Sequence, residues 1–160
     1  MNKNRLLSLL SKGANKKVYF GPQGFIVAAN EQDFDTFQQG FGVHSDGSDL
    51  CGLKAGDWQR SWLVIAIDTE LGDPYFVDCS DKNLPVYTAL CCEGLWQKEL
   101  VATSLHGFLQ CLELLFEQGQ QKNAQFVPDE TTLTDIILLA QLKDNLVKSS
   151  QSESFWALFF

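Results

Sequence analysis

The sequence has few of the residues that build metal centres, and those it has are scattered. It contains two histidines, 62 positions apart, and five cysteines with no CxxC pair. Neither pattern has the ligand spacing of a metal site. The glycines match neither GxxxxGK[ST] nor a strand-linked GxGxxG, the two patterns that cradle phosphate groups. We therefore expect neither a metal nor another cofactor.

Long hydrophobic runs are also missing. No window approaches the roughly 18 uninterrupted apolar residues of a membrane span. The apolar run LLSLL is too short for a signal peptide, and the basic segment SKGANKK follows it without a cleavage site. The odd cysteine count favours free, mostly buried thiols in a reducing compartment. We therefore expect a cytoplasmic protein with no membrane span.

Basic residues are scarce beyond the first 17 positions. The whole chain has twelve Lys and Arg against twenty Asp and Glu, a net charge of -8. Five of the basic residues lie in residues 1–17, which contain no acid, so the remainder carries a net charge of -13. A body this acidic repels phosphate backbones, which argues against a nucleic-acid partner. It would attract a basic protein and speed the encounter.

What the chain does contain is enough apolar and aromatic residues for one packed domain of 160 residues. Within residues 1–40, the pattern predicts an amphipathic helix at 3–12 that Gly13 ends, and then a hairpin at 17–29 about a Gly-Pro-Gln-Gly turn. Asn30 is expected to cap a short helix that carries Phe34 and Phe37. Residues 40–56 contain five glycines and little apolar periodicity, so we predict a loop there.

The middle of the chain reads as an antiparallel meander. The segment WLVIAID, residues 62–68, is apolar at both alternating sets of positions, which is typical of a strand buried on both faces. Strict alternation places Trp62, Val64 and Ala66 on one face, and Leu63, Ile65 and Ile67 on the other. Short turns then link it to strands at 74–80 and 85–92, and a short fourth strand is predicted at 99–103.

Two helices and an apolar tail follow. Ser104 should cap a helix that Gly119 ends, and Pro128 with Asp129 should open a last helix at about 131–148. The tail FWALFF needs covering, either by folding back onto the domain or through a homodimer or partner contact. The C-terminal helix and tail thus occupy residues 129–160. The expected class is α+β, a single domain with a mostly antiparallel sheet packed with helices.

The residues give weak support to catalysis. Asp73 and Asp81 lie in predicted turns, where short acidic side chains usually bond nearby backbone amides, and Asp78 interrupts a predicted strand. Alternation does not place two of them face to face, as a carboxylate pair would need. A thiol of Cys91 or Cys92 activated by His106 is conceivable, but no local signature supports that couple.

A protein-binding patch fits the composition better. Trp58 and Trp96 sit in the polar segments GDWQRSW and EGLWQKE, and tryptophan beside acids is common where proteins meet. The predicted partner-binding residues are Trp58, Asp68, Glu70, Asp73, Asp81, Glu93 and Trp96.

Two segments, DWQRSWLVIAIDTELGDPYFVDCSD and LPVYTALCCEGLWQKELVATSLHGFL, together resemble the SUKH superfamily over residues 57–115. This family contains Smi/Knr-type cell-wall regulators and bacterial toxin-immunity proteins. Several features in their order and spacing carry the resemblance. They are the W-x3-W pair Trp58 and Trp62, then Gly72-Asp73-Pro74, Pro85-Val86-Tyr87, Glu93-Gly94-x-Trp96, and the Ala102 to Ser104 step. Relatives often carry His-Gly where this chain has Cys91-Cys92.

The resemblance implies an α+β domain without known chemistry. For bacterial members it implies an immunity protein that binds and neutralises a cognate toxin, often a basic nuclease. For eukaryotic members it implies an adaptor or regulatory scaffold in cell-envelope or signalling processes. The leading hypothesis is therefore a non-enzymatic immunity protein with an acidic binding surface. The alternatives are the scaffold, and a Cys–His enzyme.

Overall fold

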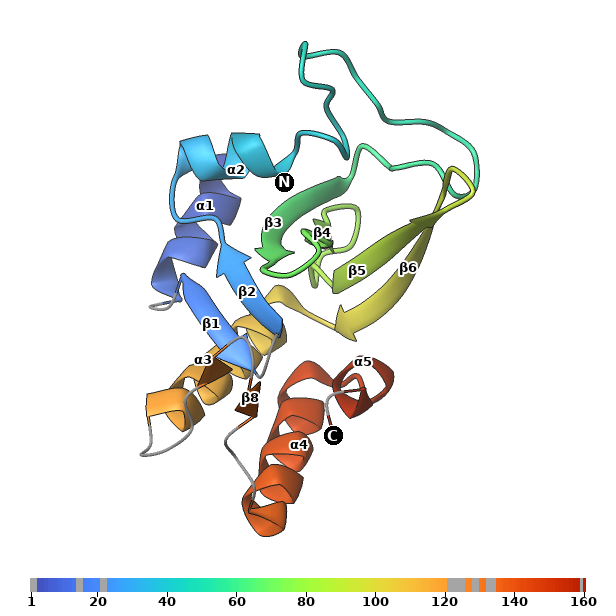
Figure 1. The fold of residues 1–160 in the computed structure, drawn as a ribbon. Helices are drawn as coiled ribbons and strands as arrows, with labels where there is room; N and C mark the ends of the chain where they lie inside the picture. Colours follow the sequence, from blue (N-terminus) through green and yellow to red (C-terminus); the bar gives the residue numbers. More distant parts are fainter. Residues whose placement is uncertain are drawn as a thin grey trace.

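Six strands form one antiparallel sheet in which every strand lies beside the strand that precedes it in the sequence (Figure 1). The computed structural model describes residues 3–13, 16–20, 23–120, 126–127, 130–131, 135–158 and 160. The strands are β1 (Lys17–Phe20), β2 (Gln23–Val27), β3 (Trp62–Asp68), β4 (Pro74–Asp78), β5 (Val86–Cys92) and β6 (Leu95–Ala102). A separate small hairpin joins β7 (Phe126–Val127) to β8 (Glu130–Thr131).

Helices pack against this sheet, which confirms the predicted α+β class and the meander at its centre. They are α1 (Lys3–Lys12), α2 (Glu31–Phe37), α3 (Leu105–Gln120), α4 (Ile136–Ser150) and α5 (Ser154–Ala157). Figure 1 shows α3 beside β1 and α5 beside β6. No helix in the described part of the chain is long and apolar enough to cross a membrane.

Two hydrophobic cores lie on opposite faces of the sheet. The larger one, which we call the helix-side core, includes Phe25, Tyr75, Phe108, Leu115, Leu146 and Trp156. The smaller one, which we call the loop-side core, consists of Trp58, Trp62, Val64, Phe76 and Ala89. The loop between α2 and β3 covers the smaller core and reaches the β5–β6 turn, where Trp96 N–H donates to Gly56 C=O at 2.7 Å.

β3 contributes side chains to both cores, as expected of a strand buried on both faces. Its alternation, however, breaks at a β-bulge, because Val64 pairs with Phe76 whereas Ala66 pairs with the preceding residue, Tyr75. Ile65 is the extra residue, so Ile65 and Ala66 both join the helix-side core while Ile67 packs against the loop-side core. The strict alternation expected from the sequence is therefore wrong for Ala66 and Ile67.

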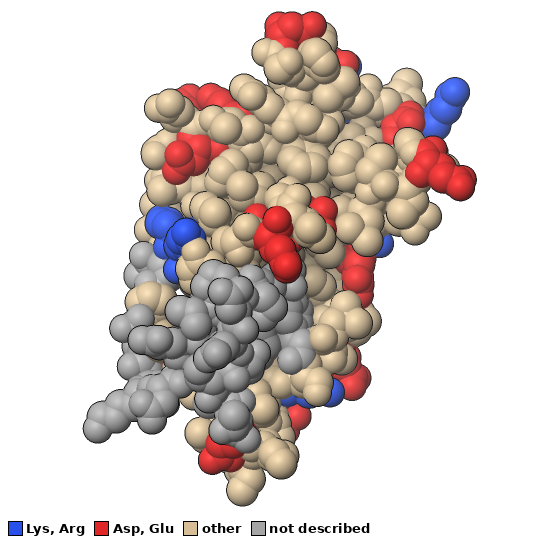
Figure 2. All heavy atoms as spheres, in the orientation of Figure 1, with Lys and Arg blue, Asp and Glu red and all other residues tan. Residues whose placement is uncertain are grey.

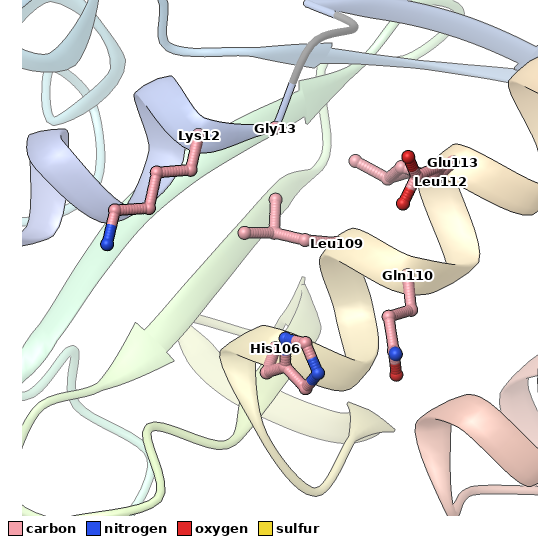
Figure 3. A pocket seen from close by; sticks show the side chains of 7 residues that line it. All are labelled: Lys12, Gly13, His106, Leu109, Gln110, Leu112 and Glu113. Carbon is pink, nitrogen blue, oxygen red and sulfur yellow. The ribbon is translucent and has the colours of Figure 1, made fainter.

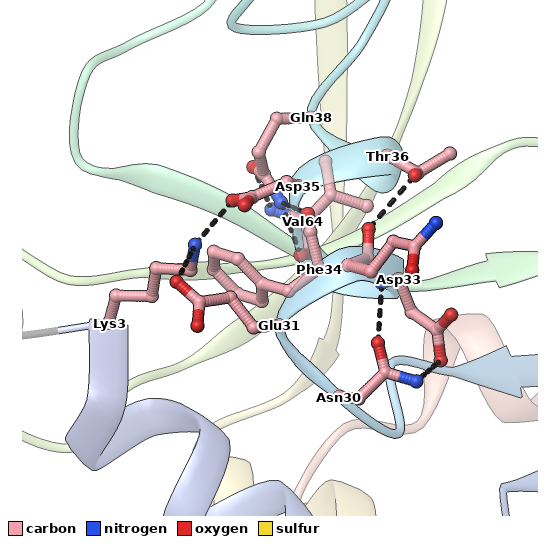
Figure 4. A network of polar contacts seen from close by, with 10 residues as sticks. Lys3, Asn30, Glu31, Asp33, Phe34, Asp35, Thr36, Gln38 and Val64 are labelled. Atoms are coloured by element: carbon pink, nitrogen blue, oxygen red, sulfur yellow. Dashed lines mark hydrogen bonds and ion pairs between the residues drawn. The ribbon is translucent and has the colours of Figure 1, made fainter.

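The side chain of Gln38, directly after α2, takes the place of a neighbouring strand beside this bulge (Figure 4). The last β2–β3 pair is Val27 with Ala66, so β2 does not reach Val64. The Gln38 Oε1 accepts from Val64 N–H at 3.0 Å, and its Nε2 donates to Val64 C=O at 2.9 Å and Phe34 C=O at 2.7 Å. One buried amide thus satisfies both backbone groups of Val64.

The first two helices follow the sequence signals. The Asn30 side chain accepts from Asp33 N–H at 2.9 Å, which confirms the predicted cap of α2. Figure 4 shows Lys3 of α1 between Glu31 and Asp35 of α2, at 2.9 and 2.6 Å. The predicted hairpin is present as β1 and β2, whereas Gly21 and Pro22 of its turn lie outside the described residues.

The β5–β6 hairpin is longer than the sequence suggested. Glu93 and Gly94 have φ angles of 53° and 79°, as in the two-residue type I′ turn that matches the twist of paired strands. β6 consequently starts at Leu95 rather than at residue 99, and Trp96 belongs to a strand.

α3 and α4 cross closely. The Ser104 hydroxyl accepts from Gly107 N–H at 3.1 Å, which confirms the predicted start of α3, but the helix continues through Gly119 to Gln120. A Cβ on Gly107 would lie 2.4 Å from the C=O oxygen of Ser149, so only glycine allows this approach. α4 begins at Ile136 with Asp135 as its cap, later than expected, and Pro128 and Asp129 lie outside the described residues.

The apolar tail folds back onto the domain, which confirms the first of the two alternatives that the sequence left open. Phe155 and Trp156 are buried in the helix-side core, and the Trp156 indole Nε1–H donates to Val101 C=O at 3.0 Å. Leu158 and Phe160 remain exposed.

We expect Gln38→Leu to lower the free energy of unfolding by about 2 to 4 kcal/mol, because it leaves the buried N–H and C=O groups of Val64 without partners. Urea unfolding of both variants would measure this. Gln39→Leu is the matched control, since Gln39 is exposed, and should change stability by no more than about 0.5 kcal/mol. Equal effects of the two substitutions would refute a special role for Gln38.

Candidate partner-binding face

Aromatic residues gather on the loop side of the sheet. Trp58 is at their centre, with ring centroids 4.8 Å from Phe76, 5.2 Å from Trp96, 5.3 Å from Phe41 and 5.4 Å from Trp62. The long loop supplies Phe41 and Trp58, and the strands supply the other three. These contacts hold the loop against the sheet and build a rigid base under the rest of this face.

The two tryptophans that the sequence singled out are not an exposed pair. Trp58 is only 2 % exposed, and its indole Nε1–H donates to Trp62 C=O at 3.2 Å. Trp96 is half-buried and packs against Trp58 and Phe41. Trp58 therefore cannot present its ring to a partner, and its role is to fill the loop-side core.

Most of the aspartates in and around the meander hold turns. Asp68 is 5 % exposed, and its Oδ1 accepts from the N–H groups of the next turn, Glu70 and Leu71. Asp78 accepts from the N–H of Ser80 at 3.0 Å and its hydroxyl at 2.6 Å, and Asp81 accepts from Asn83 N–H at 2.8 Å. The sequence predicted this role for Asp73 and Asp81; it is confirmed for Asp81, whereas the Asp73 carboxylate accepts no hydrogen bond within the described residues.

The predicted acids are spread along the meander. Asp68 ends β3, Glu70 and Asp73 follow it in the β3–β4 turn, and Glu93 belongs to the β5–β6 turn. Asp81 lies in the β4–β5 connection at the other end of the strands. Figure 2 shows acidic atoms in several separate groups, with few basic atoms between them. The structure therefore brings Asp68 and Asp73 together but does not gather all five acids into one patch.

Lys98 is the functional candidate that the sequence did not reveal. Its Nζ lies 4.1 Å from the Tyr87 ring centroid and 5.2 Å from that of Trp62, within range of a cation–π interaction. The short strand expected from residue 99 left Lys98 in a loop, so its alignment with an aromatic face was not visible. The alternation of a longer strand would have placed Lys98 on the same face as Trp96.

Acidic groups surround this aromatic pair. Asp78 pairs with Trp62 across β3 and β4, so the two side chains share one face of the sheet. Burial opposes the charge on Asp78, but hydrogen bonds from Ser80 and Ser61 and the charge of Lys98 bring the pKa of its carboxyl below the usual value. Burial, and then the charges of Asp78 and Asp81, raise the pKa of the Tyr87 hydroxyl. Apart from Lys98, the charged groups around the two rings are thus negative.

The conceivable Cys–His couple is not assembled. Cys91 and Cys92 are exposed at the turn end of β5, where Cys92 pairs with Leu95. His106 follows the far end of β6, an eight-residue strand, and at roughly 3.3 Å per residue the two ends are about 25 Å apart. That distance excludes proton transfer between His106 and either thiol.

His106 instead borders two surface pockets. The first, of about 310 Å³, lies between the end of α1 and α3, and Figure 3 shows His106, Leu109 and Glu113 on its α3 wall and Lys12 on the other. The second, of about 740 Å³, is a polar groove between α3 and α4 that includes Lys148. No thiol occurs among the described residues that line either pocket. In the part of the chain that the structure describes, no group of three or more His, Cys, Asp or Glu side chains could hold a metal ion.

Comparisons of the chain with protein-family models, with curated proteins and with solved structures find no match.

The five thiols should differ in reactivity mainly according to burial. Burial raises the pKa of Cys111 to about 12. Burial, and to a smaller extent the neighbouring Asp49 carboxylate, raise the pKa of Cys51 to about 11. We expect Ellman's reagent at pH 7.5 to modify Cys91 and Cys92 at the rate of ordinary exposed thiols, and Cys111 only after unfolding. A rate about a hundredfold higher for one of them, lost in His106→Ala, would instead support a Cys–His couple.

Asp73 and Asp78 should show opposite pH effects. Burial and the charge of Asp68 raise the pKa of Asp73, so its ionised form is unfavourable in the folded state. We expect Asp73→Asn to increase stability at pH 7. This gain should disappear as the pH falls from the raised pKa of Asp73 in the folded state to the ordinary pKa of an aspartate in the unfolded state. Asp78→Asn should decrease stability at pH 7, because the lowered pKa of Asp78 favours folding until pH falls through that value.

Thermal unfolding of the two variants and the parent between pH 3 and pH 7 would measure both effects. The same sign of change at pH 7 in both variants would contradict the assignment.

Proposed function

We propose that this chain is a non-enzymatic protein-binding domain that recognises a basic protein. The observation that carries the proposal is that few of its acidic side chains are paired with a basic side chain. Among the described residues, the carboxylates of Glu31, Asp35 and Asp49 pair with a lysine or arginine, and that of Asp46 contacts the His44 ring. No other acid of the described surface forms an ion pair, although the charge of Lys98 acts on Asp78.

This uncompensated charge suits encounter with a positively charged partner. Exposed charges act over a distance of about 8 Å at physiological salt, and they raise association rates more than they raise affinity. The partly exposed rings of Phe41, Tyr87 and Trp96, which pack on the loop-side core, add a rigid, partly apolar surface of the kind on which protein contacts usually concentrate their binding energy. The separation of His106 from Cys91 and Cys92 argues against the Cys–His enzyme that the sequence left open.

The finer proposal is that the partner is a bacterial toxin and that the chain is its immunity protein. This step rests on the resemblance to the SUKH superfamily over residues 57–115 and on the opposite charges of this chain and a basic nuclease. A cytoplasmic location belongs to the same proposal, because exposed free thiols such as Cys91 and Cys92 suit a reducing compartment.

We expect the gene beside this one to encode a toxin and the chain to restore growth of cells that express it. The triple variant Glu70→Lys, Asp73→Lys, Glu93→Lys should protect poorly. Its association with the toxin should be about tenfold slower at low salt. The matched control is Glu113→Lys, Glu117→Lys, Asp144→Lys, which changes net charge equally on exposed positions of α3 and α4.

Growth and stopped-flow association at two salt concentrations are the measurements. The proposal would be wrong if the chain neither protects nor binds the neighbouring gene product. Steering by the meander would be wrong if both triple variants slow association equally, or if the rate is insensitive to salt.

A further inference from the structure

We propose that Trp62, Tyr87 and Asp78 form a site for a single cationic side chain of the partner, and that Lys98 occupies this site in the free protein. The site takes lysine or, better, arginine. This inference deepens the proposed function and rests on it in one respect, namely that the partner is basic. The ligand class itself follows from the chemistry of the three residues.

The position of Lys98 indicates what the site accepts. Its ammonium lies 4.1 Å from the Tyr87 ring centroid and 5.2 Å from the Trp62 ring centroid, so two aromatic rings share one cation. Aromatic groups arranged in this way around a cation are a recurring recognition element for ammonium ligands. The side chain of Lys98 thus serves as an internal example of the ligand.

The rings are fixed independently of Lys98. Trp62 packs against Phe76 at 4.8 Å and Trp58 at 5.4 Å, and Tyr87 stacks on Phe76 at 5.8 Å. These contacts belong to the loop-side core and stay in place when the lysine side chain turns away. A site that is already built in this way loses little entropy when a ligand enters.

Carboxylates make the site specific for positive charge. The Asp78 side chain shares the face of Trp62, and the charges of Asp78 and Asp81 act on the Tyr87 hydroxyl. A neutral apolar side chain entering between the rings would gain ring contact but no attraction to these acids. The acids therefore distinguish a cation from other residues that bind aromatic surfaces.

Lys98 is well placed to leave. It is exposed on β6, the last strand in the order of the sheet, and its ammonium has no hydrogen bond or ion pair within the described residues. An arginine of the partner has the advantage that its planar guanidinium is less hydrated and stacks on aromatic faces. Exchange therefore replaces the lysine on the two rings with a cation that stacks on them better, and it releases the lysine to water.

Occupation by Lys98 also sets a threshold for binding. A site that is free about a tenth of the time binds its ligand about tenfold more weakly than the empty site. An isolated arginine would compete poorly, whereas an arginine presented by a docked protein has a high effective concentration. Lys98 thus reserves the site for a partner that makes other contacts as well.

The test removes Lys98 and supplies a small cation. N-acetylarginine methylamide is titrated into the folded protein while NMR follows the indole N–H signal of Trp62. We expect Lys98→Met to bind this probe about tenfold more tightly than the parent chain, with a saturable shift of the Trp62 signal. Lys54→Met, which removes an exposed lysine from the loop, should bind like the parent, and the uncharged probe N-acetylglutamine methylamide should not bind.

Two results would overturn the proposal. If Lys98→Met shows no saturable shift, the rings form no cation site and Lys98 merely packs on them. If parent and Lys98→Met bind equally, Lys98 does not occupy the site. Lys98→Gln gives the same decision if the methionine variant fails to fold. In the Lys98→Met background, Asp78→Asn should weaken binding of the probe.

The small probe separates this inference from the proposed function. Arginine binding without protection against a toxin would refute the immunity role and leave the site in place. Protection that is unaffected by Lys98→Met, in a protein that shows no probe binding, would refute the site and leave the immunity role in place.

Discussion

One extra residue in β3, next to the Val64 backbone groups that the Gln38 side chain binds, determines how the two faces of the sheet are filled. The bulge at Ile65 directs two consecutive side chains to the helix-side core. Without it, Ala66 and Ile67 would exchange faces, and a larger side chain would meet the closely packed helices. The Gln38 amide stabilises this arrangement because it satisfies the Val64 backbone groups at the point where β2 ends. Both cores therefore depend on the same short stretch of backbone.

The two cores have different consequences for function. The helix-side core is large and closed, and α3, α4 and α5 cover it. The loop-side core is small and aromatic, and a long loop covers only part of it, which leaves Tyr87 and Lys98 at its border. Rigid rings next to solvent and near acids are suited to recognition, whereas the closed core is suited only to stability. The proposed partner contact therefore belongs to the less covered face.

Local signals predicted most of the elements. Asn30 and Ser104 act through bonds to residues three positions away, and the apolar set of 62–68 reports burial directly. The bulge was not predictable, because it depends on pairing with Tyr75 and on an amide 26 positions earlier in the chain.

The candidate site also depends on contacts between residues that are distant in the sequence. Trp58 has polar neighbours in the sequence but aromatic neighbours in space, so its sequence context pointed to the surface while the structure buries it. Lys98 and Tyr87 meet only because the Glu93–Gly94 turn sets the register of β5 and β6, and neither residue is conspicuous in the sequence.

The docking of Trp156 has a consequence for biosynthesis. Its ring lies 6.1 Å from that of Phe25, so residues 131 positions apart meet in the same core. At about 5 to 20 residues per second, a ribosome needs roughly 7 to 26 s to make the intervening chain. During that interval α1 and then α3 can pack on the sheet, but the part of the helix-side core that Phe155 and Trp156 fill stays open, so nascent chains expose apolar surface until α5 emerges.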